Sequence, residues 1–347
     1  MGLKSSSASD SNTPVGVIGT GSFGQVVAKL LAEKSPVWLY ARSEESAQRV
    51  RDNGLPANVQ VTTDPAVVAK ACEVIFPMVP SANFRDMIRQ FAPYLHPYHT
   101  LIHGTKGLEL ASGQDLQSDA PLTRAQICTM SEVIQQETVV VRIGCLAGPN
   151  LASELADDKP AATVIASRFD EVIASGQKLL RSDRFQVYGN SDLIGVEICG
   201  VLKNIIAIAA GMVHELGLGE NARALLISRG LVEMIYLGQA FGGNLKAFIG
   251  LAGVGDLVAT SNSITSRNFT VGRLLVQKKS LEEVKAQMEE TAEGINTVLL
   301  AKKFAETAKI RVPITEVLHR VLYQELSAEE ATTQLMKFPS IADVDFL

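Results

Sequence analysis

A lysine and an asparagine, Lys203 and Asn204, lie in the middle of an otherwise apolar stretch over residues 191–213. Ser191 or Asp192 can cap the start of a helix there. Because apolar residues occur on every side of that helix, we expect it to be buried within the protein. A buried ammonium group needs a partner, a hydrogen-bond network or a lowered pKa, and a lysine with a lowered pKa can exchange a proton near neutral pH. The alternative is a lysine whose stem packs in the core while its head reaches water.

A glycine-rich turn, GTGSFG at residues 19–24, follows a predicted strand and opens a predicted helix. Gly19 permits the tight turn, Gly21 lets a pyrophosphate approach the backbone, and Gly24 lets helix and strand pack closely. The bound anion would then lie at the positive end of the helix dipole. Random turns also supply GxGxxG, but the position of this one after the first strand of a β–α–β unit predicts dinucleotide binding.

The residue after the second predicted strand indicates whether the ribose of such a cofactor carries a 2′-hydroxyl, as in NAD, or a 2′-phosphate, as in NADP. An acidic residue there would bind the 2′-hydroxyl of NAD, whereas this chain has Arg42, followed by Ser43 and Glu44. A guanidinium can stack on adenine and pair with a 2′-phosphate, which favours NADPH. The alternatives are that Arg42 faces solvent, or that Glu44 or Glu45 turns inward to the ribose hydroxyls.

Further charged residues lie in short polar segments. Asp256 is the one carboxylate in GLAGVGDLVAT at residues 250–260, and SRN follows at residues 266–268. Arginine beside asparagine near a helix start can hold a phosphate, although an SRN tripeptide is more often a helix cap. Lys106 comes just past a predicted strand over residues 100–103, where α/β sheets place ligand contacts. Taken alone, Lys106 also fits a solvated loop lysine.

The elements that must position these residues change character along the chain. Strands and helices alternate in the first half, which requires crossover connections and hence a mostly parallel sheet with helices on both faces. The predicted strands cover residues 15–19, 37–41, 59–62, 74–79, 100–103, 139–147, 162–166 and 185–188, and the helices between them 23–33, 44–53, 64–71, 124–136 and 170–181. Beyond residue 191 only helical patterns follow, over residues 192–213, 221–241, 245–249, 271–277, 281–289, 295–307 and 312–323.

The predicted fold is therefore α/β, with a Rossmann-like dinucleotide-binding domain over residues 14–190 and an all-helical substrate domain over residues 191–347. Residues 1–13 are polar and rich in serine, and we expect a disordered tail there. A chain of 347 residues with 46% hydrophobic residues is long enough for two such domains.

Composition and charge exclude several classes of function. The net charge of −5 argues against a nucleic-acid or anionic-membrane binder, both of which normally show a basic face. The most apolar window contains Glu197 as well as Lys203 and Asn204, which argues against a membrane span. Neither the four cysteines nor the five histidines have metal-ligand spacing, so we expect buried free thiols, no metal and a cytoplasmic location.

One helical stretch suggests self-association. Met234, Ile235, Tyr236, Leu237 and Phe241 give more apolar surface than one helix face needs, so a homodimer is expected. The alternative is an ordinary hydrophobic core.

Taken together and in this order, these stretches resemble the NAD(P)-dependent glycerol-3-phosphate dehydrogenases of the bacterial type, from about residue 15 to residue 338. GxGxxG alone is unspecific, whereas the Lys-Asn helix, GLAGVGDLVAT and SRN together are highly specific. The stretches that carry the resemblance are GTGSFG (19–24), VPSANFR (79–85), KGLE (106–109), GPNLASEL (148–155), GVEICGVLKNIIAIAAG (195–211), NARALLISRG (221–230), GLAGVGDLVAT (250–260), SRN (266–268) and AEGINT (292–297).

The resemblance implies that Lys203 is the catalytic proton acceptor. Lys106 and Asp256 would lie around the reacting carbonyl, with Asn204 and Thr260 beside them. The remaining implied ligand contacts fall into two groups. The substrate group, which includes the pair for the substrate phosphate, is Gly148, Asn150, Ser266, Arg267 and Asn268, together with Lys106, Lys203 and Asp256. The cofactor group is Gly19, Gly21, Ser22, Phe23, Gly24, Arg42, Lys106, Ala152, Arg267 and Glu293.

Two positions depart from the family pattern. The family commonly has Trp or Tyr at the position of Phe23, a difference that stacking should tolerate. It commonly has Ser or Thr followed by Phe where this chain has Asn150 and Leu151, which leaves the role of Asn150 open.

The implied activity is the reversible reduction of dihydroxyacetone phosphate to sn-glycerol 3-phosphate with NADPH or NADH, which would supply glycerophospholipid synthesis. The implied helical domain is like the C-terminal domain of 6-phosphogluconate dehydrogenase. One alternative is a related β-hydroxyacid dehydrogenase, which SRN after GLAGVGDLVAT disfavours. Another is a non-catalytic NADPH sensor, which could have lost Lys203 or Asp256, whereas this chain has both.

Overall fold

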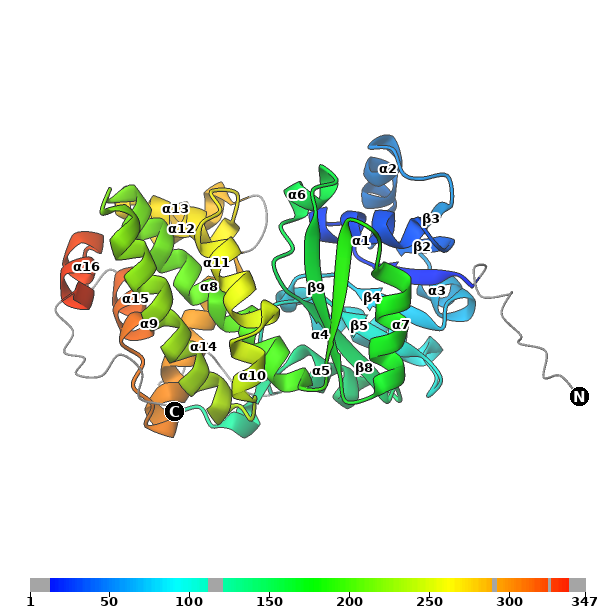
Figure 1. Cartoon of the computed structure of the whole chain (residues 1–347). Helices are drawn as coiled ribbons and strands as arrows, with labels where there is room; N and C mark the ends of the chain where they lie inside the picture. The colour runs from blue at the N-terminus through cyan, green and yellow to red at the C-terminus, as the bar shows by residue number, and fades with distance from the viewer. Residues whose placement is uncertain (1–12, 112–120, 289–291, 324–325, 337–347) are drawn as a thin grey trace, which may run out of the picture.

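The computed structural model describes residues 13–111, 121–288, 292–323 and 326–336. The predicted tail therefore lies, apart from its last residue, outside the described residues. Figure 1 shows a twisted sheet flanked by helices, with a bundle of helices beside it. The predicted fold class, a Rossmann-like domain followed by a helical domain, is confirmed. The predicted domain boundaries remain a prediction; the last sheet strand ends at Asn190 and the next helix begins at Leu193.

The sheet has eight strands in the order β10-β9-β8-β5-β4-β1-β2-β3, and every neighbouring pair is parallel except β8 with β9. The chain order reverses at β1, which pairs with β2 on one side and β4 on the other, and dinucleotides bind at such a reversal. The strands are β1 Val15–Ile18, β2 Val37–Tyr40, β3 Val59–Thr62, β4 Val74–Pro77, β5 Thr100–His103, β8 Arg142–Ala147, β9 Ala161–Ser167 and β10 Phe185–Asn190.

Helices cover both faces of this sheet, as predicted. They are α1 Ser22–Ala32, α2 Glu44–Asp52, α3 Pro65–Ala71, α4 Phe84–Phe91, α5 Met130–Glu137, α6 Ala152–Ala156 and α7 Asp170–Leu180. The start predicted for the helix over residues 124–136 is wrong. Thr129 and Glu132 form a capping box that starts α5 at Met130. The preceding residues form a short turn and strand β7, Ile127–Cys128, paired with strand β6, Glu109–Leu110.

The helical domain is organised around α8, Leu193–Glu215, which is buried along almost its whole length. This helix has the length and composition of a membrane span, but 94% of its most apolar window is buried inside the protein, as in a core helix. The other helices are α9 Gly219–Ala240, α10 Leu245–Phe248, α11 Asp256–Ser261, α12 Arg267–Val276, α13 Leu281–Gln287, α14 Glu293–Ala308, α15 Pro313–Leu322 and α16 Ala328–Met336.

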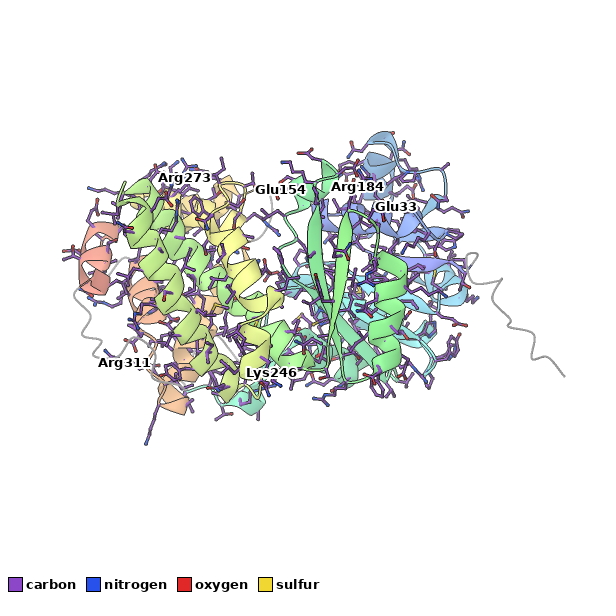
Figure 2. The ribbon with its side chains drawn as sticks, viewed as in Figure 1. Glu33, Glu154, Arg184, Lys246, Arg273 and Arg311 are labelled. Carbon is purple, nitrogen blue, oxygen red and sulfur yellow. The ribbon has the colours of Figure 1, made fainter. Side chains whose placement is uncertain are left out.

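Helix α12 packs against α8 with no side chain between the two backbones at two points. A Cβ added at Gly211 of α8 would lie 2.0 Å from the carbonyl oxygen of Phe269, and one at Gly272 of α12 would lie 1.9 Å from that of Ile208. Arg273, labelled in Figure 2, donates a hydrogen bond of 2.7 Å to Glu215 at the end of α8. These close contacts bring the start of α12 beside the middle of α8.

Two sequence-based interpretations of this half need correction. The stretch 250–260, interpreted as a loop, is helical: residues 251–255 form a π-helical turn that leads into α11. The apolar residues that suggested a dimer are mostly used within the chain, because Met234, Ile235, Leu237 and Phe241 are buried in its own core. The prediction of buried free cysteines is confirmed for Cys72, Cys128, Cys145 and Cys199.

Candidate active site

One buried carboxylate joins two lysines where the two domains meet. Lys203 of α8 donates hydrogen bonds to Asp256 and, at 2.6 Å, to Thr260, both of which lie on α11. Asp256 and Thr260 are one helical turn apart, so their side chains share a face, and the Thr260 hydroxyl lies 3.1 Å from Asp256 Oδ1. Asp256 is 1% exposed and the Lys203 side chain 6%, so the interpretation of Lys203 as a core lysine with a solvated head is wrong.

Lys106 reaches the same carboxylate from the Rossmann-like domain. Its ammonium group lies 2.7 Å from Asp256 Oδ2 and 3.3 Å from the carbonyl oxygen of Gly148. The stem of Lys106 passes over Gly200 of α8, where an added Cβ would lie 3.5 Å from its Cγ. The Lys106 side chain is 20% exposed, so it is the more accessible of the two lysines. The interpretation of Lys106 as a solvated loop lysine is therefore wrong.

The charges of this cluster favour proton transfer at neutral pH. Burial lowers the pKa of Lys203 to about 7, and the nearby Lys106 ammonium also lowers it, while Asp256 opposes the change. Burial alone would raise the pKa of Asp256, but Lys106 and Lys203 together hold it below its usual range. Asp256 is therefore a fixed anion, and Lys203 can be either protonated or neutral at physiological pH.

Polar groups for an anion gather next to this cluster, at the start of α12. Asn268 Oδ1 accepts a hydrogen bond of 3.0 Å from the backbone N–H of Gly294, and a Cβ added at Gly294 would lie 3.0 Å from the Asn204 carbonyl oxygen of α8. Ser266 caps α12 through its hydroxyl, and Arg267, the first residue of the helix, is exposed. A guanidinium at a helix N-terminus suits a phosphate. The helix-cap interpretation of SRN is thus correct for Ser266, and the ligand role of Arg267 stays a prediction.

The glycine-rich turn has the geometry that a dinucleotide requires. Gly19 has φ +117°, and an added Cβ there would lie 2.6 Å from the Met78 carbonyl oxygen. A Cβ at Gly24 would lie 2.1 Å from the Gly19 carbonyl oxygen, so helix α1 and strand β1 approach as closely as the motif predicts. The N-cap of α1 is Gly21, and no side chain caps the helix, which leaves room for a pyrophosphate. These residues fit a dinucleotide.

Two other predicted cofactor residues are Phe23, which belongs to this turn, and Arg42, which follows β2. Phe23 borders the loop that carries Lys106, because a Cβ added at Gly104 would lie 3.0 Å from the Phe23 ring. Arg42 is exposed just past β2. Glu44 forms an ion pair of 2.6 Å with Arg51, and its side chain is 69% exposed, so in this structure it does not turn inward.

Glu293 links the helical domain to the Rossmann-like domain. Its carboxylate accepts hydrogen bonds from the hydroxyl of Ser81 and, at 2.8 Å, from the backbone N–H of Ser81. Gly107, next to Lys106, packs against both side chains. Sequence reasoning did not select Ser81 as a site residue, although it follows soon after β4, which ends at Pro77, and α/β sheets place ligand contacts beyond the ends of such strands.

The side chain of Asn150 is hydrogen-bonded to strand β9. Its amide donates a hydrogen bond of 2.8 Å to Thr163 of β9, whose hydroxyl in turn contacts the carbonyl of Ala147. The loop bends at Gly148, which has φ +144°, and Ala152 begins α6. Substrate contact by Asn150 therefore remains a prediction, and so do the ligand roles of the other site residues.

One of the five histidines, His103, contacts a buried carboxylate. Its Nε2 lies 2.9 Å from a carboxylate oxygen of Glu197 on α8, and both residues are buried. Sequence reasoning used Glu197 only to exclude a membrane span. A carboxylate in an apolar helix needs a partner for the same reason that Lys203 does, and that signal was present in the sequence.

The glycine-rich turn thus borders the loop that carries Lys106. Lys106 and Lys203 share Asp256 as their counterion, and the pKa of Lys203 is about 7. That combination defines a dinucleotide-dependent dehydrogenase, in which a proton moves as a hydride is transferred. Residues 14–173 match the N-terminal part, and residues 192–333 the C-terminal part, of NAD-dependent glycerol-3-phosphate dehydrogenase. The chain belongs to this family.

Individual relatives are similar to this chain over nearly its whole length. A glycerol-3-phosphate dehydrogenase [NAD(P)+] of Geobacter metallireducens is 40% identical, with 93% of this chain and 96% of the relative covered. One of Pseudomonas putida is 37% identical, with 96% and 97% covered. A crystal structure of glycerol-3-phosphate dehydrogenase from Coxiella burnetii matches with a TM-score of 0.85 and 32% identity, covering 95% of this chain and all of that one.

Proposed function

We propose that the protein catalyses the reversible reduction of dihydroxyacetone phosphate to sn-glycerol 3-phosphate with NADPH or NADH. The observation that carries this proposal is the sharing of Asp256 by Lys106 and Lys203, with Lys203 at a pKa of about 7. The curated relatives bear the name of this enzyme. A related β-hydroxyacid dehydrogenase or a non-catalytic NADPH sensor is not favoured by these relatives.

Each group in the cluster has a distinct task in this reaction. The bound nicotinamide supplies the hydride. Lys203 gives a proton to the carbonyl oxygen during reduction and takes it back in the reverse direction. Lys106 polarises that oxygen with its positive charge, while Asp256 and Thr260 hold Lys203 in place. Asn204 lies beside Lys203 on α8 and completes the proposed catalytic set.

The first test measures binding and turnover in the native chain. Titration calorimetry with dihydroxyacetone phosphate, with and without cofactor, is expected to show substrate binding that strengthens when cofactor is present. Oxidation of NADPH should follow when both are supplied. Cofactor binding with neither substrate binding nor turnover would instead support the sensor.

The substrate phosphate is proposed to bind to Ser266, Arg267 and Asn268, with Gly148 and Asn150 in the neighbouring loop. Replacing Arg267 with alanine should raise the KM for dihydroxyacetone phosphate roughly 10- to 100-fold. The reason is that a charge-assisted contact of about 1.5–3 kcal/mol is lost. Steady-state kinetics measures the change, and Arg273→Ala serves as a matched control, since Arg273 lies on the same helix, near its other end, where it pairs with Glu215.

Unphosphorylated dihydroxyacetone separates phosphate binding from other roles of Arg267. It should be no worse a substrate for the Arg267→Ala variant than for the native enzyme. If the substitution impairs turnover of both substrates equally, the assignment of Arg267 to the phosphate is incorrect.

The cofactor is proposed to bind along the glycine-rich turn and to reach the helical domain at Arg267 and Glu293. The proposed contacts are Gly19, Gly21, Ser22, Phe23, Gly24, Arg42, Lys106, Ala152, Arg267 and Glu293. Glu44 is exposed and paired with Arg51, and Arg42, which is exposed just past β2, offers a 2′-phosphate a partner.

We therefore expect NADPH to work at least as well as NADH, and Arg42→Ala to impair NADPH selectively. The measurement is kcat/KM for both cofactors in the native enzyme and in the variant. Arg49→Ala is the matched control, because Arg49 is an exposed arginine of the adjacent helix α2. A preference for NADH that Arg42→Ala leaves unchanged would mean that Arg42 only faces solvent.

The cellular setting is proposed on the same basis. The product is a precursor of glycerophospholipids, and we propose a cytoplasmic enzyme that binds neither nucleic acid nor membrane. A homodimer is also proposed. Its contact would use exposed apolar side chains such as Leu218 and Leu225, because four of the five residues that first suggested it, all except Tyr236, lie in the core.

A further inference from the structure

A second buried carboxylate lies on α8, six residues before Lys203. Glu197 is 6% exposed and accepts hydrogen bonds from the Ser131 hydroxyl and, at 3.0 Å, from the Ser131 backbone N–H at the start of α5. Its third contact is His103, the last residue of β5, which is 1% exposed. The two atoms, Nε2 and Oε1, are 2.9 Å apart, although the ring N–H is not well aligned with the oxygen.

We propose that His103 and Glu197 are a positioning pair, which holds the end of β5 against α8 and thereby sets the contact of Lys106 with Asp256. This inference rests on the proposed function, because the lysine that it positions is the one that polarises the substrate carbonyl. Neither residue is proposed to touch the substrate.

Both members of the pair lie close to the Lys106 side chain. His103 precedes Lys106 by three residues. Glu197 precedes Gly200 by one helical turn, and the stem of Lys106 passes over Gly200. The pair and the lysine stem therefore lie on the same face of α8, so a shift of β5 along that face would move the Lys106 ammonium away from Asp256.

Other contacts of the same loop lead back into the sheet. The backbone N–H of Gly104 donates to the carbonyl of Pro77 at 3.0 Å, and the Thr105 hydroxyl donates to that of Val79 at 2.6 Å. Both acceptors lie at the end of β4, so these bonds fix the loop within the Rossmann-like domain. They do not fix it relative to α8, which carries Lys203.

The pair lies in buried surroundings, where the charge of Glu197 needs His103 as a partner. Burial alone would raise the pKa of Glu197, but His103 and Ser131 hold it below its usual range, so the carboxylate is charged at neutral pH. His103 also meets the edge of the Phe84 ring and lies opposite Cys145 of β8, a buried thiol whose pKa is raised, so that it stays uncharged. Without His103, the buried charge of Glu197 keeps only Ser131 as a partner and the link from α8 to β5 is lost.

The test compares two substitutions of His103. His103→Leu removes the polar contact, whereas His103→Gln keeps an N–H donor that can reach Glu197. For His103→Leu, we expect kcat for dihydroxyacetone phosphate to fall about tenfold, because small displacements of catalytic groups have effects of this size or larger. The KM for NADPH should stay within about twofold of its native value, and His103→Gln should keep most of kcat.

The pH profile gives a readout that a purely structural role would not move. Oxidation of glycerol 3-phosphate needs neutral Lys203, so its rate should rise with pH through about 7 in the native enzyme. When Lys106 moves away, it no longer helps to lower the pKa of Lys203, so this rise should shift to higher pH in His103→Leu. Ser131→Ala is the matched control, because it removes the other side-chain partner of Glu197 without loosening the Lys106 loop. It should lower Tm and leave the profile in place.

The outcomes separate this inference from the proposed function. An inactive native enzyme would contradict the function itself. An active native enzyme, with His103→Leu unchanged in kcat and pH profile, would overturn the positioning pair alone, as would an equal shift of the profile in Ser131→Ala. If His103→Leu does not fold, His103→Asn, which is polar but too short to reach Glu197, takes its place with the same expected shift, and an unmoved profile there overturns the proposal.

Discussion

Replacing Lys203 with alanine is expected to lower turnover at least about a hundredfold while leaving cofactor binding nearly intact. The variant loses the proton donor of the reduction, and water in the vacated space is a poor substitute. The fold should persist, because Asp256 keeps Lys106 as a partner at 2.7 Å. Steady-state kinetics gives kcat, and fluorescence titration gives the affinity for NADPH. Lys246→Ala is the matched control, since Lys246 is an exposed lysine of the same domain, labelled in Figure 2.

The direction of the pH dependence follows from the pKa of Lys203. Reduction needs the protonated ammonium, so its rate should fall as pH rises through about 7, whereas oxidation should rise over the same range. The Lys203→Ala variant should lose both dependences. A variant that retains most of its kcat would remove Lys203 from the mechanism.

Replacing Asp256 with asparagine is expected to reduce kcat about a hundredfold or more and to raise the KM for dihydroxyacetone phosphate. Asp256 raises the pKa of Lys203 against the effect of burial, so without this charge Lys203 becomes neutral at lower pH and is a poor proton donor at neutral pH. Lys106 loses its anchor at the same time. The rise in glycerol 3-phosphate oxidation should therefore shift to lower pH, opposite to the shift expected for His103→Leu.

Stability provides a second measurement on Asp256→Asn. Removing one partner from a buried ion pair costs about 3–5 kcal/mol, and here two cations lose their partner together, so Tm should fall clearly. Thr260→Val is the comparison variant, because it removes the hydroxyl that contacts Lys203 at 2.6 Å and Asp256 at 3.1 Å and leaves the charges unchanged. Its profile should stay near that of the native enzyme. An unmoved pH profile in Asp256→Asn would show that Asp256 does not control the charge of Lys203.

Sequence patterns predict the regular elements of this fold where local residues determine them. The alternation of strands and helices up to residue 190 and the buried helix around Lys203 depend on periodicity and on the cost of burying charge, both of which are local. Two elements were missed for different reasons. Strand β6 depends on distant partners, because Arg85 forms ion pairs with both Glu109 of β6 and Glu137 of α5. Helix α11 was missed because the glycine-rich residues just before Asp256 do not look helical in sequence.

The same distinction holds for the site. Lys203 could be selected from its helix alone, because a buried ammonium group is unusual in any apolar segment. The other members of the cluster could not be selected in this way. Asp256 lies 53 residues from Lys203 and 150 residues from Lys106 in the sequence, and only the family resemblance connected them. Glu197 could have been selected by the argument used for Lys203. Its partner His103 could not, because nothing in the local sequence brings β5 to α8.

The direct backbone contact between α8 and α12 makes the enzyme vulnerable where it meets neither substrate nor cofactor. Gly211 and Gly272 each lack space even for a methyl group. A substitution at either position would push one helix off the other and move the start of α12, the proposed phosphate site, away from Lys203. In a random mutagenesis library, we would expect these two glycines to tolerate as little change as the lysines themselves. During evolution, the two helices can therefore diverge in sequence on their other faces while this pair of positions stays fixed.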